Sequence, residues 1–325
     1  MSVFIIRRLL QAIVVVLVMS LIVFVGINVV GDPVHILVSD EMTQLEIEAF
    51  VRQLGLDRPL HEQYFAFLSN ALQGNLGNSF VHAEPALKLI LQRMPATLEL
   101  ALVAMLIAVL FGIPLGVYAG LRPETPFSRT IMAGSILGFS LPTFWVGLML
   151  IMVFAVMLGW LPSTGRGSTA SLAGIQVSFL TADGLRHLLL PAFNLALFKL
   201  SLVTRLACAG AREASLQDYV KFARAKGIAP QRVVLVHILK NILIPVVTVL
   251  GLEFGGLIAF SVVTETVFAW PGMGKLLIDS IQNLDRPVVV AYLIITVLMF
   301  VVINLLVDLL YSVLDPRVRL KELKA

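Results

Sequence analysis

The sequence predicts an all-α polytopic membrane protein with six transmembrane helices and both termini in the cytoplasm. Of the 325 residues, 58% are hydrophobic and 14% are charged, whereas a soluble domain has about 45–50% apolar and about 25% charged residues. Uncharged runs long enough to cross a bilayer recur along the chain, and the basic residues gather in segments expected on one side of the membrane. This composition excludes a soluble globule and intrinsic disorder.

Six apolar segments are expected to span the membrane, since a bilayer core needs about 20 apolar residues per helix. The first is longer than the apolar core of a signal peptide, about 7–15 residues, so we interpret it as an uncleaved span. The third is too long for one straight helix, and Pro142 is its expected break. The segments are 9–30, 100–121, 130–161, 188–204, 242–263 and 288–307.

The distribution of Lys and Arg gives the orientation. With the N-terminus in the cytoplasm, most of these residues fall in cytoplasmic segments, as the positive-inside rule requires. The densest segment is loop 205–240, with seven Lys and Arg residues. The net charge of +4 therefore reflects an asymmetry across a membrane and does not indicate a surface for nucleic acid.

The spans divide the chain into three expected parts, and the outer segment after the first span is too long to be a simple loop. Within that segment we expect a helix over 41–54 that ends at Gly55, and a second helix that begins at Pro59. The parts are the N-terminus with the first span (1–31), a periplasmic helical insertion (32–94), and a permease-like core (95–325) with a cytoplasmic loop (205–240) and a periplasmic loop (264–287).

Sequence motifs for catalysis are absent. The chain has no G-x-x-x-x-G-K-[ST] loop for nucleotide phosphates, no H-E-x-x-H motif and no G-x-S-x-G motif. A single cysteine excludes an internal disulfide and a cysteine-based metal site. We therefore expect a non-enzymatic chain that binds no metal or cofactor, and an ATPase in another subunit if ATP drives it.

Few charged residues lie within the predicted spans, and such residues are candidates for function. Glu253 is in mid-span and is a candidate for lining a polar pathway, while a structural pair with Lys199 is an equal alternative. Lys199 also lies within about one and a half turns of Arg205, close enough to reach the inner surface. Glu99 and Asp308 are at span ends, where snorkelling or capping is the ordinary explanation.

Glycines recur at four-residue intervals in three predicted spans, a spacing that lets helices approach closely. The pattern indicates a packed bundle or a subunit interface and points to no particular function. The glycines are Gly112, Gly116 and Gly120, then Gly134 and Gly138, and finally Gly251 and Gly255.

Loop 205–240 contains the most informative motif. Between Tyr219 and Gly227, small residues and cations occupy a short predicted helix that ends at the glycine. Such a helix can seat in a groove of a partner protein, although a solvated basic loop is an equal reading of its composition. In the outer loop, residues 270–274 predict a tight turn with an aromatic residue at the membrane interface.

The chain resembles the permease subunits of binding-protein-dependent ABC importers, in the branch for dipeptides, oligopeptides and nickel, and specifically the first of its two permeases. Ala223 and Gly227 fit the loose E-A-A, three residues, G pattern of that family. The chain departs from the branch at Asn75, Cys208, Arg212 and Phe222. The segments that carry the resemblance are 7–8, 31–33, 54–60, 74–79, 95–100, 112–116, 140–145, 223–227, 270–274 and 315–317.

The resemblance implies a type I ABC importer permease of the bacterial inner membrane that forms a translocation pathway for peptides. The alternatives within this class are a nickel chelate, glutathione or another small solute. The implied partners are a second homologous permease, two cytoplasmic ATPase subunits that hold ATP and Mg, and a periplasmic or lipid-anchored solute-binding protein.

The resemblance also assigns expected roles to residues. The ATPase contact is expected at Tyr219, Ala223, Arg224, Ala225, Lys226 and Gly227, and a contact with the binding protein or a gate is expected at Trp270, Pro271 and Gly272. An ion-coupled secondary transporter is the alternative from another class, and it would need coupling residues in broken spans. A membrane-embedded enzyme or sensor is supported by no motif.

Overall fold

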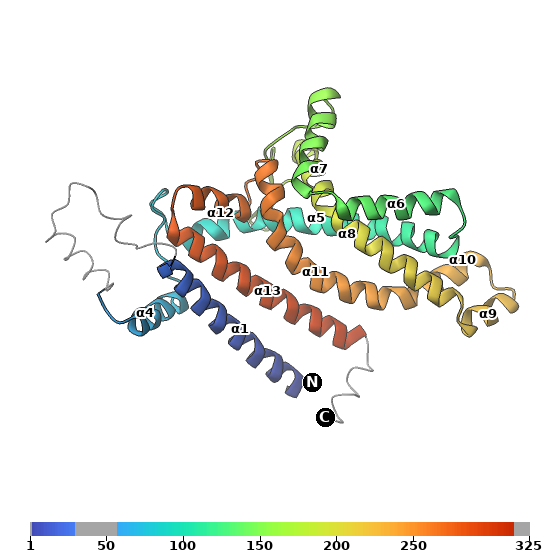
Figure 1. Ribbon diagram of the computed structural model, residues 1–325, viewed down its shortest axis with the longest axis horizontal. Helices are drawn as coiled ribbons and strands as arrows, with labels where there is room; N and C mark the ends of the chain where they lie inside the picture. Colours follow the sequence, from blue (N-terminus) through green and yellow to red (C-terminus); the bar gives the residue numbers. More distant parts are fainter. Residues whose placement is uncertain (1, 30–56, 315–325) are drawn as a thin grey trace. The chain divides into compact units, whose positions relative to one another are not determined.

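The computed structural model describes residues 2–29 and 57–314, and these are mostly helical (Figure 1). They form two compact units. The first holds the described residues up to Gln92 together with Leu277–Val301, and the second holds Arg93–Leu276 together with the described residues from Val302 onward. The predicted helix at 41–54, Gly55, and the motifs at 31–33 and 315–317 lie outside the described residues.

Within the described residues, five helices are long and apolar enough to cross a membrane, or six crossings exist if a bent pair counts as one. This agrees with the six predicted spans. The five helices are α1 (Ser2–Val29), α5 (Ala86–Leu121), α8 (Ala182–Ser215), α11 (Leu239–Val267) and α13 (Arg286–Leu314).

The bent pair is the third predicted span, and its break is where the sequence places it. Helix α6 (Pro126–Ser140) is followed by α7 (Thr143–Leu150) and the π-helix η1 (Ile151–Met157), and the two parts meet at 109°. Pro142 is the residue before α7 and has an extended backbone. Proline has no N–H and clashes with the preceding turn, which favours a break in the helix at this position. Figure 1 shows α7 turning away from α6.

Helices α5 and α8 extend furthest beyond their predicted spans. Helix α5 begins at Ala86, so the expected boundary between residues 94 and 95 falls inside a continuous helix. Ala86 and Ile90 are fully buried, and this packing extends the helix toward its N-terminus. Helix α8 continues past residue 205 to Ser215, because small buried residues such as Ala207 and Ala211 favour the helix and pack closely.

In the first unit, α4 (Leu60–Leu72) packs against α1. Pro59 immediately precedes α4, one residue from the predicted position. The hydroxyl groups of Tyr64 and Ser20 are 2.9 Å apart, and the Tyr64 ring meets the Phe24 ring edge-on with 5.4 Å between centroids. Tyr64 thus joins a polar and an aromatic contact across the two helices.

A second connection in this unit is made by Asp285, which lies just before α13. Its carboxylate accepts hydrogen bonds from the Ser79 hydroxyl at 2.5 Å and from the Phe80 N–H at 3.1 Å. Asp285 is buried, and its charge is stabilised by these donors. The contact joins residues that are about 200 positions apart in the chain.

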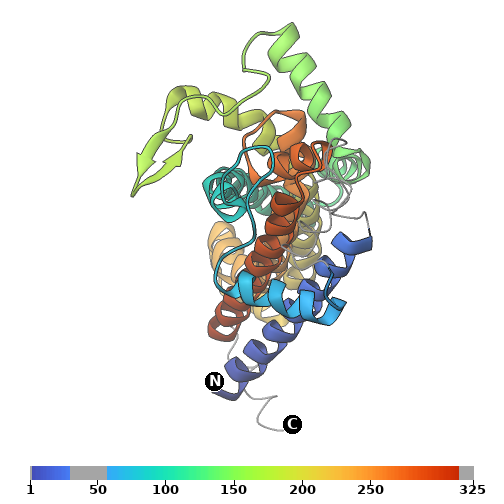
Figure 2. The same cartoon turned by 90° about the vertical axis from the view of Figure 1, so that its left-hand side faces the viewer.

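The sequence predicts an all-α fold, but the structure also has a small β-hairpin in the outer loop of the second unit. Strands β1 (Ala170–Leu172) and β2 (Ile175–Val177) pair antiparallel, with Ala170 opposite Val177. The two residues between the strands both have positive φ, as a tight hairpin turn requires. Figure 2 shows the hairpin in yellow-green, projecting beyond the helices of this unit.

The regularly spaced glycines of α5 lie against α8, which agrees with the packed bundle and places these three glycines inside the chain. A Cβ on Gly116 would collide with the Thr204 carbonyl oxygen and lie 2.6 Å from the Ala207 methyl group. Gly112 and Gly120 are as close to α8. Gly134 on α6 is different, because a Cβ there would meet nothing within 4 Å.

We predict that Gly116→Ala lowers the stability of the permease in detergent by about 1–3 kcal/mol, because the added methyl group forces α5 and α8 apart. Gly134→Ala is the matched control, since it makes the same change in open space on a neighbouring helix. Thermal unfolding midpoints measure both. Equal midpoints for the two variants would contradict the close approach of α5 and α8.

Candidate functional site

Loop 205–240 is helical, as predicted. After α8 ends, the chain forms α9 (Asp218–Ala225), the single turn α10 (Pro230–Arg232) and the π-helix η2 (Val233–Ile238), which leads into α11. Figure 1 shows α9 and α10 together at the end where α8 finishes and α11 starts. The loop therefore presents a short helix at one end of the helical bundle.

Gly227 ends α9 in a Schellman motif. Its N–H donates to the Arg224 carbonyl at 3.0 Å, and the Ile228 N–H donates to the Ala223 carbonyl at 3.2 Å. Gly227 has φ +73°, a backbone conformation that costs non-glycine residues about 1–2 kcal/mol. The predicted helix end at Gly227 is therefore confirmed. The positive φ at this position explains why a glycine occupies it.

The predicted coupling residues lie on both faces of α9. Ala223 is buried in its own chain, in a hydrophobic cluster that includes Val220 and Ile238. Its small side chain therefore allows α9 to pack on the permease itself, and its expected role in the ATPase contact stays a prediction. The remaining predicted residues are exposed, namely Tyr219, Arg224, Ala225, Lys226 and Gly227.

Two contacts hold exposed side chains of α9 in place. The Tyr219 hydroxyl accepts a hydrogen bond from the Asn241 amide at 2.9 Å. The Lys226 ammonium lies 4.5 Å from the centroid of the Phe222 ring, a cation–π distance. The exposed face of α9 is thus aromatic and cationic.

Glu253 of α11 pairs with Lys199 of α8, so the pairing alternative is the one observed, and Lys199 does not reach out to the inner surface. The Lys199 side chain is 8% exposed and that of Glu253 is 36% exposed. A buried ammonium needs a counter-charge, which Glu253 supplies. The exposed part of the carboxylate leaves Glu253 accessible from outside the chain.

An aromatic and charged row extends from this pair across three helices. The Lys199 ammonium is 5.1 Å from the centroid of the Phe198 ring, which stacks on Phe139 of α6 with 4.6 Å between centroids. The Arg205 guanidinium lies 4.6 Å from the centroid of the same Phe139 ring. Charged groups cannot face hydrocarbon without a large penalty, so this row faces protein or water when the chain is in the membrane.

The predicted gate residues are in the interior. Trp270 is fully buried, and its indole N–H donates to the Ala96 carbonyl at 2.9 Å. Gly272 is buried against the Glu265 carboxylate, which a Cβ at that position would strike, and Pro271 is half-buried. This turn packs on α5 of its own chain, and the expected role of Trp270, Pro271 and Gly272 as a contact with the binding protein or a gate stays a prediction.

Glu265 of α11 is the centre of this packing. It is fully buried, and it accepts hydrogen bonds from the Thr97 hydroxyl at 2.7 Å, the Ser261 hydroxyl at 2.9 Å and the Lys275 N–H at 3.0 Å. Lys275 is in the first turn of α12 (Met273–Gln282), where free N–H groups favour a negative charge. One carboxylate therefore joins α5, α11 and α12.

Glu99 is also buried, which corrects the expectation of a residue that snorkels or caps at a span end. It forms an ion pair with Arg166 at 2.6 Å and accepts hydrogen bonds from the Ser178 N–H at 2.5 Å and the Phe179 N–H at 2.9 Å. The Arg166 guanidinium in turn lies 5.7 Å from the centroid of the Trp270 ring. Glu99 therefore fixes the β-hairpin loop to α5. The side chain of Asp308 lies outside the described residues.

The sequence analysis did not identify Thr97, Glu265 and Arg166, whose side chains hold the outer loops against α5 and α11. The available signal was the pair of motifs at 95–100 and 270–274, which the structure brings together. The sequence does not reveal their proximity, because about 170 residues separate them and no local pattern encodes the contact.

Comparisons with known proteins give the same family that the sequence motifs indicate. The chain matches the family described as binding-protein-dependent transport system inner membrane component over residues 112–320. Residues 1–101 match the N-terminal part described for such membrane components.

This chain belongs to that family.

It is an ABC importer permease of the inner membrane, and ATP hydrolysis in these systems belongs to separate subunits. The permease therefore works with a solute-binding protein and with ATPase subunits. The secondary transporter and the membrane-embedded enzyme are excluded by this membership.

Named relatives cover most of the permease. It is 43% identical over 305 residues to the di/tripeptide transport system permease protein DppB of Pseudomonas aeruginosa (strain UCBPP-PA14), covering 89% of this chain and 90% of that protein. It is 38% identical over 320 residues to the oligopeptide permease AppB of Bacillus subtilis (strain 168), covering 98% and 99%. It is also 38% identical over 319 residues to the glutathione permease GsiC of Escherichia coli (strain K12), covering 98% and 99%.

The fold has a counterpart among solved structures. A chain of the inward-facing MetNI methionine ABC transporter superimposes with a TM-score of 0.55 at 17% identity, covering 70% of the permease and 96% of that chain. A second crystal form of the same transporter gives a TM-score of 0.53. This likeness confirms the type I importer fold.

We predict that Thr97→Val destabilises the permease by about 1–3 kcal/mol, because the Glu265 carboxylate and the Met273 N–H each lose a partner in the interior. Thr266→Val is the matched control, since Thr266 is exposed on α11 and its hydroxyl donates only to the Val262 carbonyl. Thermal unfolding of both variants in detergent is the measurement. A midpoint for Thr97→Val equal to that of Thr266→Val would show that the Glu265 network contributes no stability.

Proposed function

We propose that the permease forms, with a second homologous permease, the translocation pathway for dipeptides or oligopeptides. The identity of 43% to a di/tripeptide permease over 89% of the chain carries this proposal. Two cytoplasmic ATPase subunits that hold ATP and Mg drive the cycle, and a periplasmic or lipid-anchored binding protein delivers the solute. Glutathione is the second candidate solute, since the 38% identical GsiC is a glutathione permease, and a nickel chelate is the third.

The exposed face of α9 is the surface proposed for one ATPase. Its Schellman end fixes the helix direction, and its buried face with Val220 and Ala223 joins it to the core that contains α8 residues. A displacement of α9 by the ATPase therefore moves α8 as well, since packed cores transmit rigid-body motion. This mechanical connection supports the proposed coupling role of Tyr219, Arg224 and Lys226.

The row that contains Glu253 supports a position for the pathway. Its charged groups Lys199 and Glu253 require a polar or protein environment in the membrane. A peptide carries an ammonium group, a carboxylate and amides, and a wall of carboxylate, cations and aromatic rings can contact all of these weakly. We therefore propose that the face of α8 and α11 around Lys199 and Glu253 lines the pathway.

The substrate is tested through the solute-binding protein. Purification of that protein with its bound ligand, followed by mass spectrometry, identifies the delivered solute. A di-, tri- or oligopeptide is the expected result. Bound glutathione or a nickel chelate would replace the peptide assignment while leaving the importer mechanism unchanged.

We predict that Gly227→Trp keeps the permease in the membrane but abolishes uptake and ATP hydrolysis stimulated by the binding protein. The indole would project from an exposed position at the end of α9, where a Cβ meets nothing within 4 Å, and would block a docking ATPase. Gly174→Trp is the matched control, since Gly174 is also exposed, has φ +84° and has open space around it. Normal uptake by Gly227→Trp would refute the docking surface.

We predict that Glu253→Gln lowers uptake without loss of assembly, because it removes the charge opposite Lys199 at a partly exposed position. The double variant Lys199→Met/Glu253→Gln distinguishes the two roles of Glu253. Uptake stays low in the double variant if Glu253 lines the pathway, and it recovers if the pair is only structural. Unchanged uptake in Glu253→Gln would remove Glu253 from the pathway.

A further inference from the structure

We propose that a groove between α6 and α8 binds the phosphate headgroup of an anionic phospholipid through Arg205 and Arg212. The groove has a volume of about 440 Å³, within the range of about 300–1,000 Å³ typical of small-molecule sites. Its polar and charged side chains come from one face of α8, and Met132 of α6 lines it from the other side. The lining residues that carry the argument are Met132, Arg205, Arg212, Glu213 and Leu216.

Arg205 is held in place but lacks a counter-ion. Its guanidinium lies against the Phe139 ring at 4.6 Å, and its Nε is buried without a hydrogen-bond partner. Within residues 2–29 and 57–314, no carboxylate forms an ion pair with Arg205 or Arg212. Because the described residues leave the charge of Arg205 without a counter-ion beside the groove, the groove favours an anion next to its guanidinium.

The charges near the groove leave a positive excess. Lys199 is neutralised by Glu253, so that pair contributes no net charge. Glu213 offsets one of the two groove arginines, and one positive charge remains. A guanidinium presents a planar fork that matches phosphate oxygens with two parallel hydrogen bonds.

The depth of the groove suits a lipid headgroup. Arg205 begins the segment that the distribution of basic residues places at the cytoplasmic surface, where arginine side chains meet the headgroup layer. The cytoplasmic leaflet carries anionic lipids, and basic pockets between membrane helices on this side are suited to their headgroups.

The apolar lining distinguishes a lipid from other anions. Met132 and Leu216 line the groove beside the two arginines, so the site pairs a cationic part with an apolar part. Inorganic phosphate or a peptide carboxylate would use only the cations. A phospholipid uses both, because its glycerol and acyl chains can lie along Met132 of α6, whereas Leu216 lies further into the cytoplasmic segment than the two arginines.

The test is native mass spectrometry of the permease purified with its partner subunits and titrated with phosphatidylglycerol. Phosphatidylcholine is the second probe, since it has the same phosphate without a net negative charge. We expect phosphatidylglycerol to bind more tightly, and each arginine to account for roughly fivefold in affinity. Arg205→Gln/Arg212→Gln should therefore lose about 30-fold.

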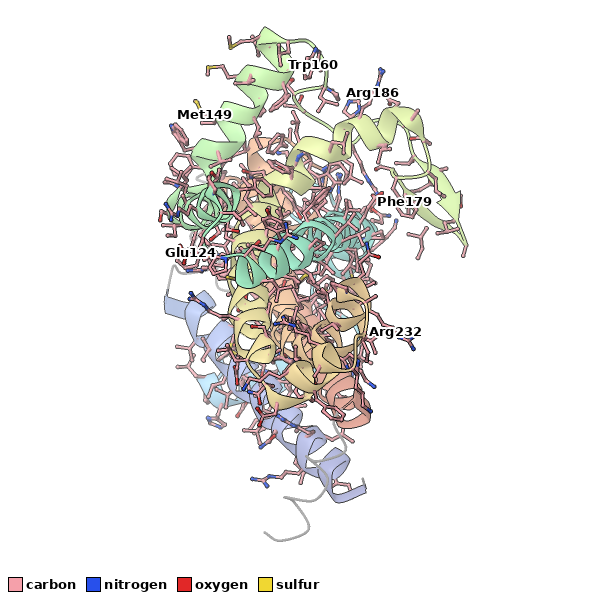
Figure 3. All side chains as sticks on the ribbon, turned by 90° about the vertical axis from the view of Figure 1, so that its right-hand side faces the viewer. Glu124, Met149, Trp160, Phe179, Arg186 and Arg232 are labelled. Atoms are coloured by element: carbon pink, nitrogen blue, oxygen red, sulfur yellow. The ribbon has the colours of Figure 1, made fainter. Side chains whose placement is uncertain are left out.

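Control variants make the result specific to the groove. Arg232→Gln removes the same charge from an exposed residue of α10, at the edge of the helices in Figure 3, and should leave binding unchanged. Arg205→Lys keeps the charge without the planar fork and should give an intermediate loss. The single variant Arg212→Gln changes an exposed side chain, so it tests the site with little effect on folding.

Four outcomes would overturn the proposal. They are equal binding of the two lipids, unchanged binding in the double variant, an equal loss in Arg232→Gln, and displacement of phosphatidylglycerol by inorganic phosphate or by a dipeptide. Displacement by the dipeptide would assign the groove to a peptide carboxylate instead. Peptide uptake is not needed for any of these measurements, so they are independent of the proposed substrate.

Discussion

The second unit of the permease depends on a buried carboxyl group, Glu265, that is held by hydrogen bonds. Glu265 is stabilised by hydroxyl groups from α5 and α11 and by a main-chain N–H of α12. An unpaired charge in a low-dielectric interior is tolerated only when hydrogen bonds replace its hydration. The three helices must therefore stay together for Glu265 to keep its hydrogen-bond partners, and the turn with Trp270 is held in the core as a result.

The same requirement explains the other polar groups in the membrane part of the chain. Glu99 is paired with Arg166, and Lys199 is paired with Glu253. Each pair joins segments that are far apart in the chain, so each charge also fixes a tertiary contact. Arg205 departs from this rule, since its charge is held against a ring and its Nε has no partner. Arg205 is the residue on which we centre the proposed lipid site.

Two elements of the permease differ in how far they are buried, and this difference bears on the proposed contact with an ATPase. The turn at Trp270 is buried and joined to α5, whereas α9 has one face in the core and one face exposed. A helix of this kind can receive a force on its exposed face and transmit it through its packed face. The permease family works with separate ATPase subunits, and the exposed face of α9 is the surface that we propose for this contact.

The sequence by itself determined the fold class, the spans, the break at Pro142 and the end of α9 at Gly227. These features depend on local physics, namely apolar length, the missing N–H of proline and the positive φ that glycine permits. Only the tertiary structure decided that Ala223 and Trp270 face inward and that Lys199 pairs with Glu253. Those outcomes depend on which helix faces which, and contacts between residues tens to hundreds of positions apart leave no periodic signal in one sequence.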